Sequence, residues 1–190
     1  MLMGDVAEDT AEDTPGDMSM DSPTDGQIDA AANILALLIG RGATVSAAES
    51  LTGGLIGVAL TAPAGASAAF RGGVVAYATD LKAALLGVPS ELLSREGAVH
   101  PDVAAAMAEG VRERTKSDYG LAVTGVAGPD PQDGRPVGTV HIALSGPGKR
   151  VWHRDIMLDG GRDQIRQGTC REALSLLRGV LEANLGEHSG

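Results

Sequence analysis

Apolar residues recur at helical spacing near the start of the chain. This segment follows Thr24-Asp25-Gly26-Gln27, whose spacing is that of a capping box, so a helix is expected to begin at Thr24. Glycines at positions 40 and 42 should end it. The positions that repeat at helical spacing are Ile28, Ala31, Ile34, Leu35 and Leu38.

Short apolar runs alternate with helical segments over the rest of the chain. We expect strands at about 43–48, 71–79, 119–124, 137–144 and 150–158. Helices are expected at about 55–60, 80–86, from Pro89, from Pro101 to 116, and from 162 to 185. Gly146-Pro147-Gly148-Lys149 indicates a hairpin between the last two strands. This order predicts an α/β fold with a mainly parallel sheet covered on both faces by helices.

Residues 1–24 lack apolar periodicity and are predicted to form a disordered acidic tail ahead of one domain, residues 25–190. A solubilising role is the simpler interpretation, and an acidic arm that binds another protein is the alternative. Eight acids and no Lys or Arg fall within the first 26 residues: Asp5, Glu8, Asp9, Glu12, Asp13, Asp17, Asp21 and Asp25.

Composition narrows the class of protein. A length of 190 residues is typical of one domain. The net charge of −10 repels the phosphate backbone of nucleic acids, so nucleic-acid binding is not expected. The single cysteine, Cys170, cannot form an internal disulfide and is interpreted as a small buried hydrophobe. The acidic N-terminus is unlike a signal peptide, and the apolar stretch 30–39 is too short to span a bilayer. We therefore expect a cytoplasmic protein with no membrane contact.

The first candidate site is the turn Ser50-Leu51-Thr52-Gly53-Gly54, which follows a predicted strand and opens a helix. Ligands of open α/β sheets lie beyond the carboxyl ends of strands. Backbone N–H groups of Thr52, Gly53 and Gly54 at the positive end of a helix dipole would stabilise a phosphate or an oxyanion. An ordinary helix cap is the alternative.

The second candidate site is the segment that contains Tyr77 and Lys82. A serine nucleophile needs a group to take its proton, and a desolvated lysine can do so. A surface lysine is the alternative, and the nearby Asp80 could raise the pKa of Lys82. The four histidines are His100, His141, His153 and His188, and none fits a catalytic or metal motif. His141 and His153 lie on predicted strands and are interpreted as structural.

The third candidate site is the loop Thr124-Gly125-Val126-Ala127-Gly128-Pro129. Its backbone could hold an anion, although a tight turn is the default interpretation. It lacks the Walker lysine and the dinucleotide glycine pattern, so no nucleotide cofactor and no metal are expected. Candidate cations for an anionic ligand are Arg71, Arg162 and Arg166.

In combination these segments resemble the CinA C-terminal domain family, which includes the nicotinamide-nucleotide amidases. The resemblance covers about residues 27–185. It implies a three-layer α/β/α sandwich with a mixed sheet, and a homodimer as a common state. The motifs that carry it are Ala48-Glu49-Ser50-Leu51-Thr52-Gly53-Gly54, Phe70-Arg71-Gly72-Gly73-Val74-Val75-Ala76-Tyr77, Lys82, Leu86-Gly87-Val88-Pro89, Gly97-Ala98-Val99, Val123-Thr124-Gly125-Val126-Ala127-Gly128-Pro129 and Pro136-Val137-Gly138-Thr139-Val140.

The resemblance implies hydrolysis of the carboxamide of nicotinamide mononucleotide to nicotinic acid mononucleotide and ammonia, without a metal. Ser50 matches the family's nucleophile, and Lys82, alone or with Tyr77, would deprotonate it. A catalytically silent binding or partner module is the alternative. The substrate-binding positions that we expect are Thr52, Gly53, Gly54, Arg71, Thr124, Gly125, Gly128 and Arg162.

Three local departures from the family pattern stand near these residues. Leu51 replaces a frequent cysteine that the chemistry does not require, and Ala78-Thr79-Asp80 replaces a Ser-Asn-Glu type of sequence. Gly160-Gly161-Arg162 replaces Gly-Asp-Arg, which retains the arginine and removes an acid. No activity of the larger N-terminal domain of full-length relatives is carried over to this chain.

Overall fold

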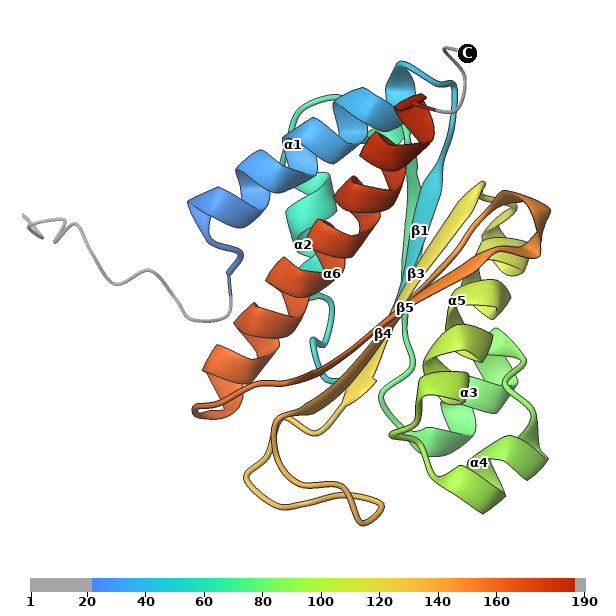
Figure 1. Ribbon diagram of the computed structural model, residues 1–190, viewed down its shortest axis with the longest axis vertical. Helices are drawn as coiled ribbons and strands as arrows, with labels where there is room; N and C mark the ends of the chain where they lie inside the picture. The colour runs from blue at the N-terminus through green and yellow to red at the C-terminus, as the bar shows by residue number, and fades with distance from the viewer. Residues whose placement is uncertain (1–21, 187–190) are drawn as a thin grey trace, which may run out of the picture.

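A computed structural model describes residues 22–186, with the backbone alone for 184–186 (Figure 1). The predicted disordered tail falls almost wholly outside the described residues. The helices are α1 (Asp25–Ile39), α2 (Leu55–Thr61), α3 (Thr79–Leu86), α4 (Ser90–Glu96), α5 (Pro101–Thr115) and α6 (Arg162–Gly186), with short 3-10 turns η1 (Ala66–Ala68) and η2 (Pro147–Lys149). The strands are β1 (Val45–Glu49), β2 (Phe70–Val75), β3 (Tyr119–Gly125), β4 (Thr139–Ser145) and β5 (Val151–Met157).

The five strands form one mixed sheet in the order β2-β1-β3-β4-β5. β1 pairs in parallel with β2 and with β3, whereas β4 pairs antiparallel with β3 and with β5. Two pairings are parallel and two are antiparallel, because β4 runs antiparallel to β3 as well as forming the predicted hairpin with β5. β4 is the strand that runs against the other four.

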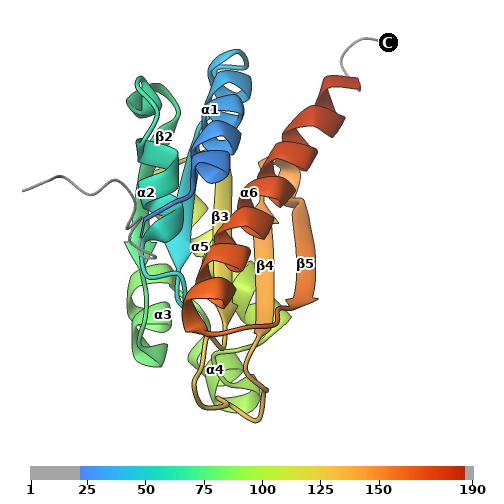
Figure 2. The same cartoon turned by 90° about the vertical axis from the view of Figure 1, so that its left-hand side faces the viewer.

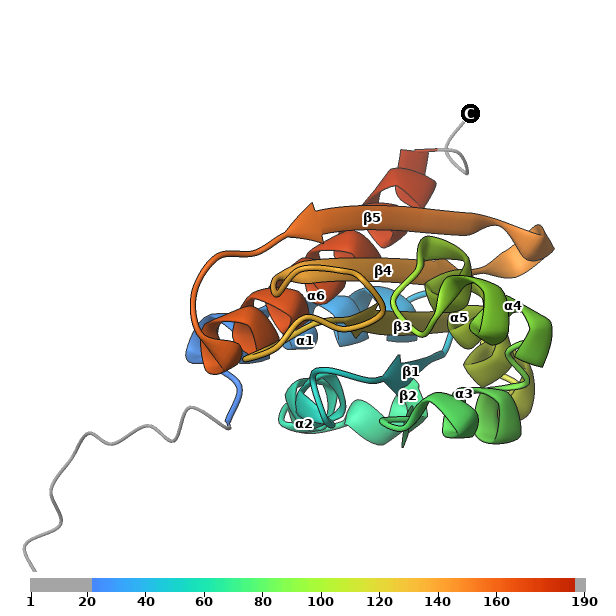
Figure 3. The same ribbon diagram turned by 90° about the horizontal axis from the view of Figure 1, so that it is seen from below.

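Helices cover both faces of this sheet. α1, α2 and α6 pack on one face, and α3, α4 and α5 pack on the other (Figures 2 and 3). The three-layer α/β/α sandwich with a mixed sheet is confirmed. No helix within residues 22–186 combines the length and the apolar character that crossing a membrane requires.

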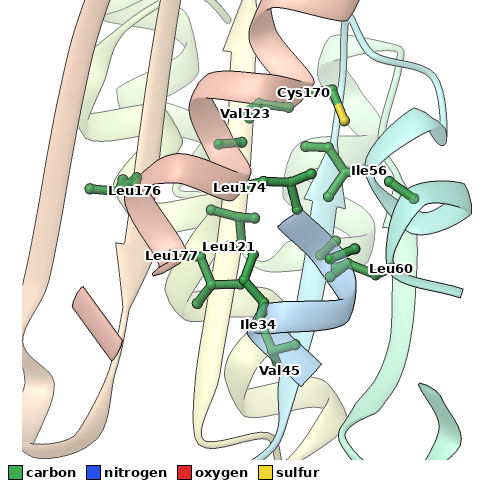
Figure 4. Packing of buried hydrophobic residues seen from close by; sticks show 14 of the residues in the cluster. Ile34, Val45, Ile56, Leu60, Leu121, Val123, Cys170, Leu174, Leu176 and Leu177 are labelled. Atoms are coloured by element: carbon green, nitrogen blue, oxygen red, sulfur yellow. The ribbon is translucent and has the colours of Figure 1, made fainter. Parts of the chain in front are cut away.

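The larger core lies between the sheet and α1, α2 and α6. Leu121 and Val123 of β3 face Leu174 of α6 and Ile56 of α2 (Figure 4), whereas the intervening Ala122 belongs to the core on the α5 side. Burying each large aliphatic side chain contributes about 1.5–3 kcal/mol before ordering costs. The core is built mainly from aliphatic residues.

Local signals located most element ends correctly. Thr24 caps α1 in a complete capping box with Gln27, and Pro101 begins α5. β2 ends at Val75, however, and not near residue 79 as predicted. Its neighbour β1 ends at Glu49, and after the bond from Ala76 N to Glu49 O no paired strand remains to continue the ladder. The chain turns there and enters α3.

Candidate active site

Ser50 lies directly after the carboxyl end of β1, which is buried along its whole length. The N–H of Gly53 donates to the carbonyl of Ser50 at 3.0 Å, which closes a tight turn between β1 and α2. Gly53 and Gly54 have φ values of +63° and +106°, which favour glycine because a Cβ is strained there. This turn holds Ser50 at the sheet edge where the loops meet, with 8% of the residue exposed.

Lys82 of α3 reaches this serine from the neighbouring element. Its Nζ lies 3.1 Å from Ser50 Oγ, 2.8 Å from the carbonyl oxygen of Ala76 and 3.4 Å from that of Tyr77. Lys82 is 1% exposed, so it is not a surface lysine. The structure thus brings together two residues that are separated by 32 positions in the chain.

Burial lowers the pKa of Lys82 from 10.5 to about 8, against an opposing effect of the Asp133 carboxylate. At pH 7 a larger fraction of Lys82 is therefore neutral than of an exposed lysine. The acid that opposes this shift is Asp133, from the loop before β4, and not the nearby Asp80 that the sequence suggested.

The partners of Lys82 suit an uncharged amine. Carbonyl oxygens only accept hydrogen bonds, whereas the Ser50 hydroxyl can also donate one. A neutral Lys82 can direct its two N–H groups to the carbonyls of Ala76 and Tyr77, which leaves the nitrogen lone pair for the proton of Ser50. This is the arrangement that a general base needs toward a serine nucleophile.

Tyr77 is oriented differently from Lys82. Tyr77 is 54% exposed, and its hydroxyl accepts a hydrogen bond of 2.8 Å from Arg162 Nη2. Arg162 Nη1 donates to the carbonyl of Gly128 at 2.9 Å. Tyr77, Gly128 and Arg162 therefore meet in one contact, and the Tyr77 backbone carbonyl links this contact to Lys82.

Glu49 holds the turn that carries Ser50, a role that the sequence analysis did not assign. Its carboxylate accepts bonds from Thr52 Oγ1 and from the N–H groups of Gly54, Ile56 and Gly57, at 2.7–3.1 Å. Of the N–H groups expected to point outward, that of Gly54 donates to Glu49 at the start of α2, and that of Gly53 donates to the carbonyl of Ser50. An acid at the end of a buried strand, just before a helix, was the available signal.

Two residues of the third candidate segment make contacts with other parts of the same chain. Thr124 Oγ1 donates to the carbonyl of Ala98 at 2.7 Å, and Thr124 is 1% exposed. A Cβ on Gly125 would lie 2.5 Å from the carbonyl oxygen of Thr139, so glycine permits close packing on β4. Both contacts position the loop in which Gly128 meets Arg162.

The structure does not bring Arg71 to this edge. Arg71 lies near the amino end of β2, where its Nε donates to the carbonyl of Thr115 at 2.6 Å. Ser50 follows the carboxyl end of the adjacent parallel strand, so the length of the strand separates the two residues. Arg166 does reach the site, with Nη2 3.4 Å from the Thr52 carbonyl oxygen.

His141 and His100 have structural contacts elsewhere in the fold. His141 Nδ1 lies 2.7 Å from Asp155 Oδ1, between β4 and β5, and the His100 side chain caps α5. Among residues 22–186, no group of three or more His, Cys, Asp or Glu is placed to hold a metal ion. Cys170 is packed in the core, where burial and then Glu49 raise the pKa of its thiol to about 12.

Comparison with known sequences places this site in a family. The model of the CinA C-terminal domain matches residues 27–181. A CinA-like protein of Frankia casuarinae is 55% identical over 148 residues, which are 78% of this chain and 34% of that protein. A putative competence-damage inducible protein of Desulforamulus reducens is 49% identical over 146 residues, 77% and 35% of the two chains. The chain thus spans about a third of the length of these curated relatives.

Solved structures agree with the sequence comparison. The crystal structure of a competence/damage inducible protein of Agrobacterium tumefaciens superposes with a TM-score of 0.80 at 40% identity, covering 84% of this chain and 98% of that one. A CinA superfamily protein of Escherichia coli gives 0.74 at 32% identity, covering 82% and 92%. Taken with the family match over residues 27–181, these likenesses establish that the chain belongs to the CinA C-terminal domain family.

Proposed function

We propose that this chain is a nicotinamide-nucleotide amidase, which hydrolyses nicotinamide mononucleotide to nicotinic acid mononucleotide and ammonia. The observation that carries the proposal is the distance of 3.1 Å between Ser50 Oγ and the Nζ of a buried lysine whose pKa is lowered to about 8. A serine beside a neutral amine is equipped for acyl transfer. The choice of the nucleotide as substrate rests on the family resemblance.

The proposed reaction uses Lys82 as base and then as acid. Ser50 Oγ bonds to the amide carbon while its proton passes to Lys82 Nζ, and the C–N bond breaks as this proton goes to the leaving ammonia. Lys82 then takes a proton from the water whose oxygen attacks the ester on Ser50. The C–O bond to Ser50 breaks, the proton returns to its Oγ, and the acid product leaves.

Arg162 is the cation best placed for the phosphate of this substrate. A guanidinium has five N–H donors, and two of the Arg162 nitrogens engage Tyr77 and Gly128, which fixes its plane at the loop. The donors that remain suit a phosphate oxygen. Arg71 is left out of the proposed site because of its position at the other end of β2.

The decisive experiment measures ammonia release from nicotinamide mononucleotide by the purified full chain. Ser50→Ala should lower kcat by about 10³-fold or more, because no nucleophile remains. Arg162→Met should raise KM for the nucleotide and leave turnover of nicotinamide riboside, which has no phosphate, unchanged.

Ser46→Ala is the matched control. Ser46 is a buried serine near the amino end of β1, away from Ser50. Its hydroxyl donates a hydrogen bond to the Thr115 hydroxyl of α5. This variant should keep the wild-type kcat. Wild-type protein that binds the nucleotide and releases no ammonia would instead establish a silent binding module, and full activity in Ser50→Ala would remove Ser50 as nucleophile.

A further inference from the structure

The strongest unassigned feature near Ser50 is the buried carboxylate of Glu49. Glu49 is 2% exposed, and the bonds to its side chain come from one hydroxyl and three backbone N–H groups. Oε1 accepts from Gly57, whereas Oε2 accepts from Thr52, Gly54 and Ile56. All four partners donate, which suits the acceptor-only chemistry of an ionised carboxyl group.

These bonds span both sides of the turn that presents Ser50. Glu49 precedes the serine in the chain, and its partners follow at positions 52, 54, 56 and 57. The N-cap residue of α2, Gly54, has no side chain to cap the helix, so the carboxylate of Glu49 supplies that function from the strand. The carboxylate of Glu49 is thereby bonded to Gly57 at the far end of this segment and to three residues in between, Thr52, Gly54 and Ile56.

We propose that Glu49 is a positioning residue for the nucleophile: its carboxylate fixes the Ser50–Gly54 turn and so holds Ser50 Oγ on Lys82 Nζ. The inference rests on the proposed function. Within residues 22–186 the Glu49 side chain makes no hydrogen bond or ion pair with Lys82, so it acts through the backbone of the turn. An error of about 1 Å in the placement of a reacting group can cost about 10²-fold in rate.

A second consequence concerns the substrate. The Glu49 carboxylate already accepts hydrogen bonds from backbone N–H groups at the start of α2. A phosphate is therefore not expected to bind there, because the carboxylate would repel a second anion. The phosphate should bind on the Arg162 side of the site. Thr52, whose hydroxyl donates to Glu49, would then support the turn and not the substrate.

The experiment compares Glu49→Gln with the wild-type chain. An amide places one NH₂ group where a carboxylate oxygen accepted bonds, so at least one backbone N–H loses its acceptor. We expect kcat to fall by about 10- to 100-fold with KM changed by less than about threefold. The pH midpoint of kcat/KM should stay near 8, because burial controls the pKa of Lys82. Loss of helix stability alone would lower Tm and leave kcat unchanged below the transition.

Two further measurements keep the inference testable if Glu49→Gln folds poorly. Thr52→Val removes one of the four bonds with little change in shape, and it should lower kcat by severalfold with unchanged KM. A rise in KM without loss of kcat would instead make Thr52 a substrate contact and overturn the inference. Hydrogen exchange at the amides of Gly54, Ile56 and Gly57 should be slow in the wild-type chain and faster in either variant.

The outcomes separate this inference from the proposed function. A wild-type chain without activity on nicotinamide mononucleotide refutes the proposed substrate, while the rate at which a fluorophosphonate labels Ser50 still reports how well the serine is positioned. Labelling and kcat within twofold of wild type in Glu49→Gln would overturn the role of Glu49. The control Ser46→Ala should match the wild-type chain in both measurements.

Discussion

Lys82 shows how burial prepares an ordinary side chain for the proposed role of base. An exposed lysine is protonated at neutral pH, whereas this one is buried beside two carbonyls and a serine hydroxyl. Desolvation penalises the charged form, and the carbonyl oxygens stabilise either form by accepting N–H bonds. The lowered pKa and the three neighbours of Nζ are both consistent with the proposed role of Lys82 as a base.

The pKa of Lys82 predicts how activity depends on pH. Only the neutral amine can take the proton of Ser50, and its fraction grows tenfold per pH unit below a pKa of about 8. We expect kcat/KM to rise with that slope from pH 6 and to level off above pH 8. Initial rates of ammonia release across this range provide the measurement. An acidic limb that stays flat down to pH 5 would contradict a lysine base.

The position of the Tyr77 hydroxyl predicts a limited catalytic effect. It bonds to Arg162, and the contact that Tyr77 makes with Lys82 is through its backbone carbonyl. Tyr77→Phe should therefore keep kcat within about tenfold and raise KM, because Arg162 loses one of its anchors. Steady-state kinetics provide the measurement. A loss as large as that of Ser50→Ala would show that the hydroxyl takes part in proton transfer.

At the level of elements, the site depends on the close approach of α3 and α5. The chain packs the end of α3 directly on Gly110 of α5, where a Cβ would lie 1.8 Å from the Leu86 carbonyl oxygen. α3 also carries Lys82, so the packing of these two helices determines where the amine lies. Backbone cannot shift as cheaply as a flexible side chain.

Gly110→Ala tests this dependence. The added methyl should lower the free energy of unfolding by about 1–3 kcal/mol and lower kcat, because α3 must move away. Gly179→Ala in α6 is the matched control: nothing lies within 4 Å of its added Cβ. That control should be neutral or more stable by about 0.5–1 kcal/mol. Denaturant unfolding and kinetics measure both, and equal stability of the two variants would contradict the packing argument.

At the level of the whole molecule, the acidic N-terminal segment joins the domain at a defined place. Ser22 O accepts a bond of 2.8 Å from Gln167 Nε2 of α6, and Thr24 caps α1. Deleting residues 1–21 should therefore leave folding and kcat unchanged, whereas a deletion through 24 should cost about 1 kcal/mol for the lost cap. Thermal unfolding and ammonia release check both. Loss of activity on the shorter deletion would give the tail a function beyond solubility.

The homodimer implied by the family resemblance stays a prediction. Light scattering of the full chain at micromolar concentration should give a mass about twice the 19.2 kDa of one chain. A mass of one chain across the concentration range used for the activity measurements would contradict it.

Local signals in the sequence were sufficient to predict the order of the elements and most of their ends. Capping residues, proline at a helix start and apolar period act within a few residues of the chain, so Thr24 and Pro101 mark helix starts without knowledge of the rest. The alternation of strands and helices was sufficient for the α/β class. The end of β2 was not predictable in this way, because a strand ends where its partner ends.

Which candidate residues meet, and in what environment, depends on packing between segments that are remote in the chain. Nothing local distinguishes Lys82 from a surface lysine, and its lowered pKa follows from burial beside Ser50 and the carbonyls of Ala76 and Tyr77. In the same way, Arg71 looked equivalent to Arg162 in the sequence but lies at the other end of its strand. The contacts of Glu49 with four hydrogen-bond donors of the following turn and helix could not be read from the sequence. Burial, distance and hydrogen-bond partners arise between segments remote in the chain, and these quantities determine chemistry.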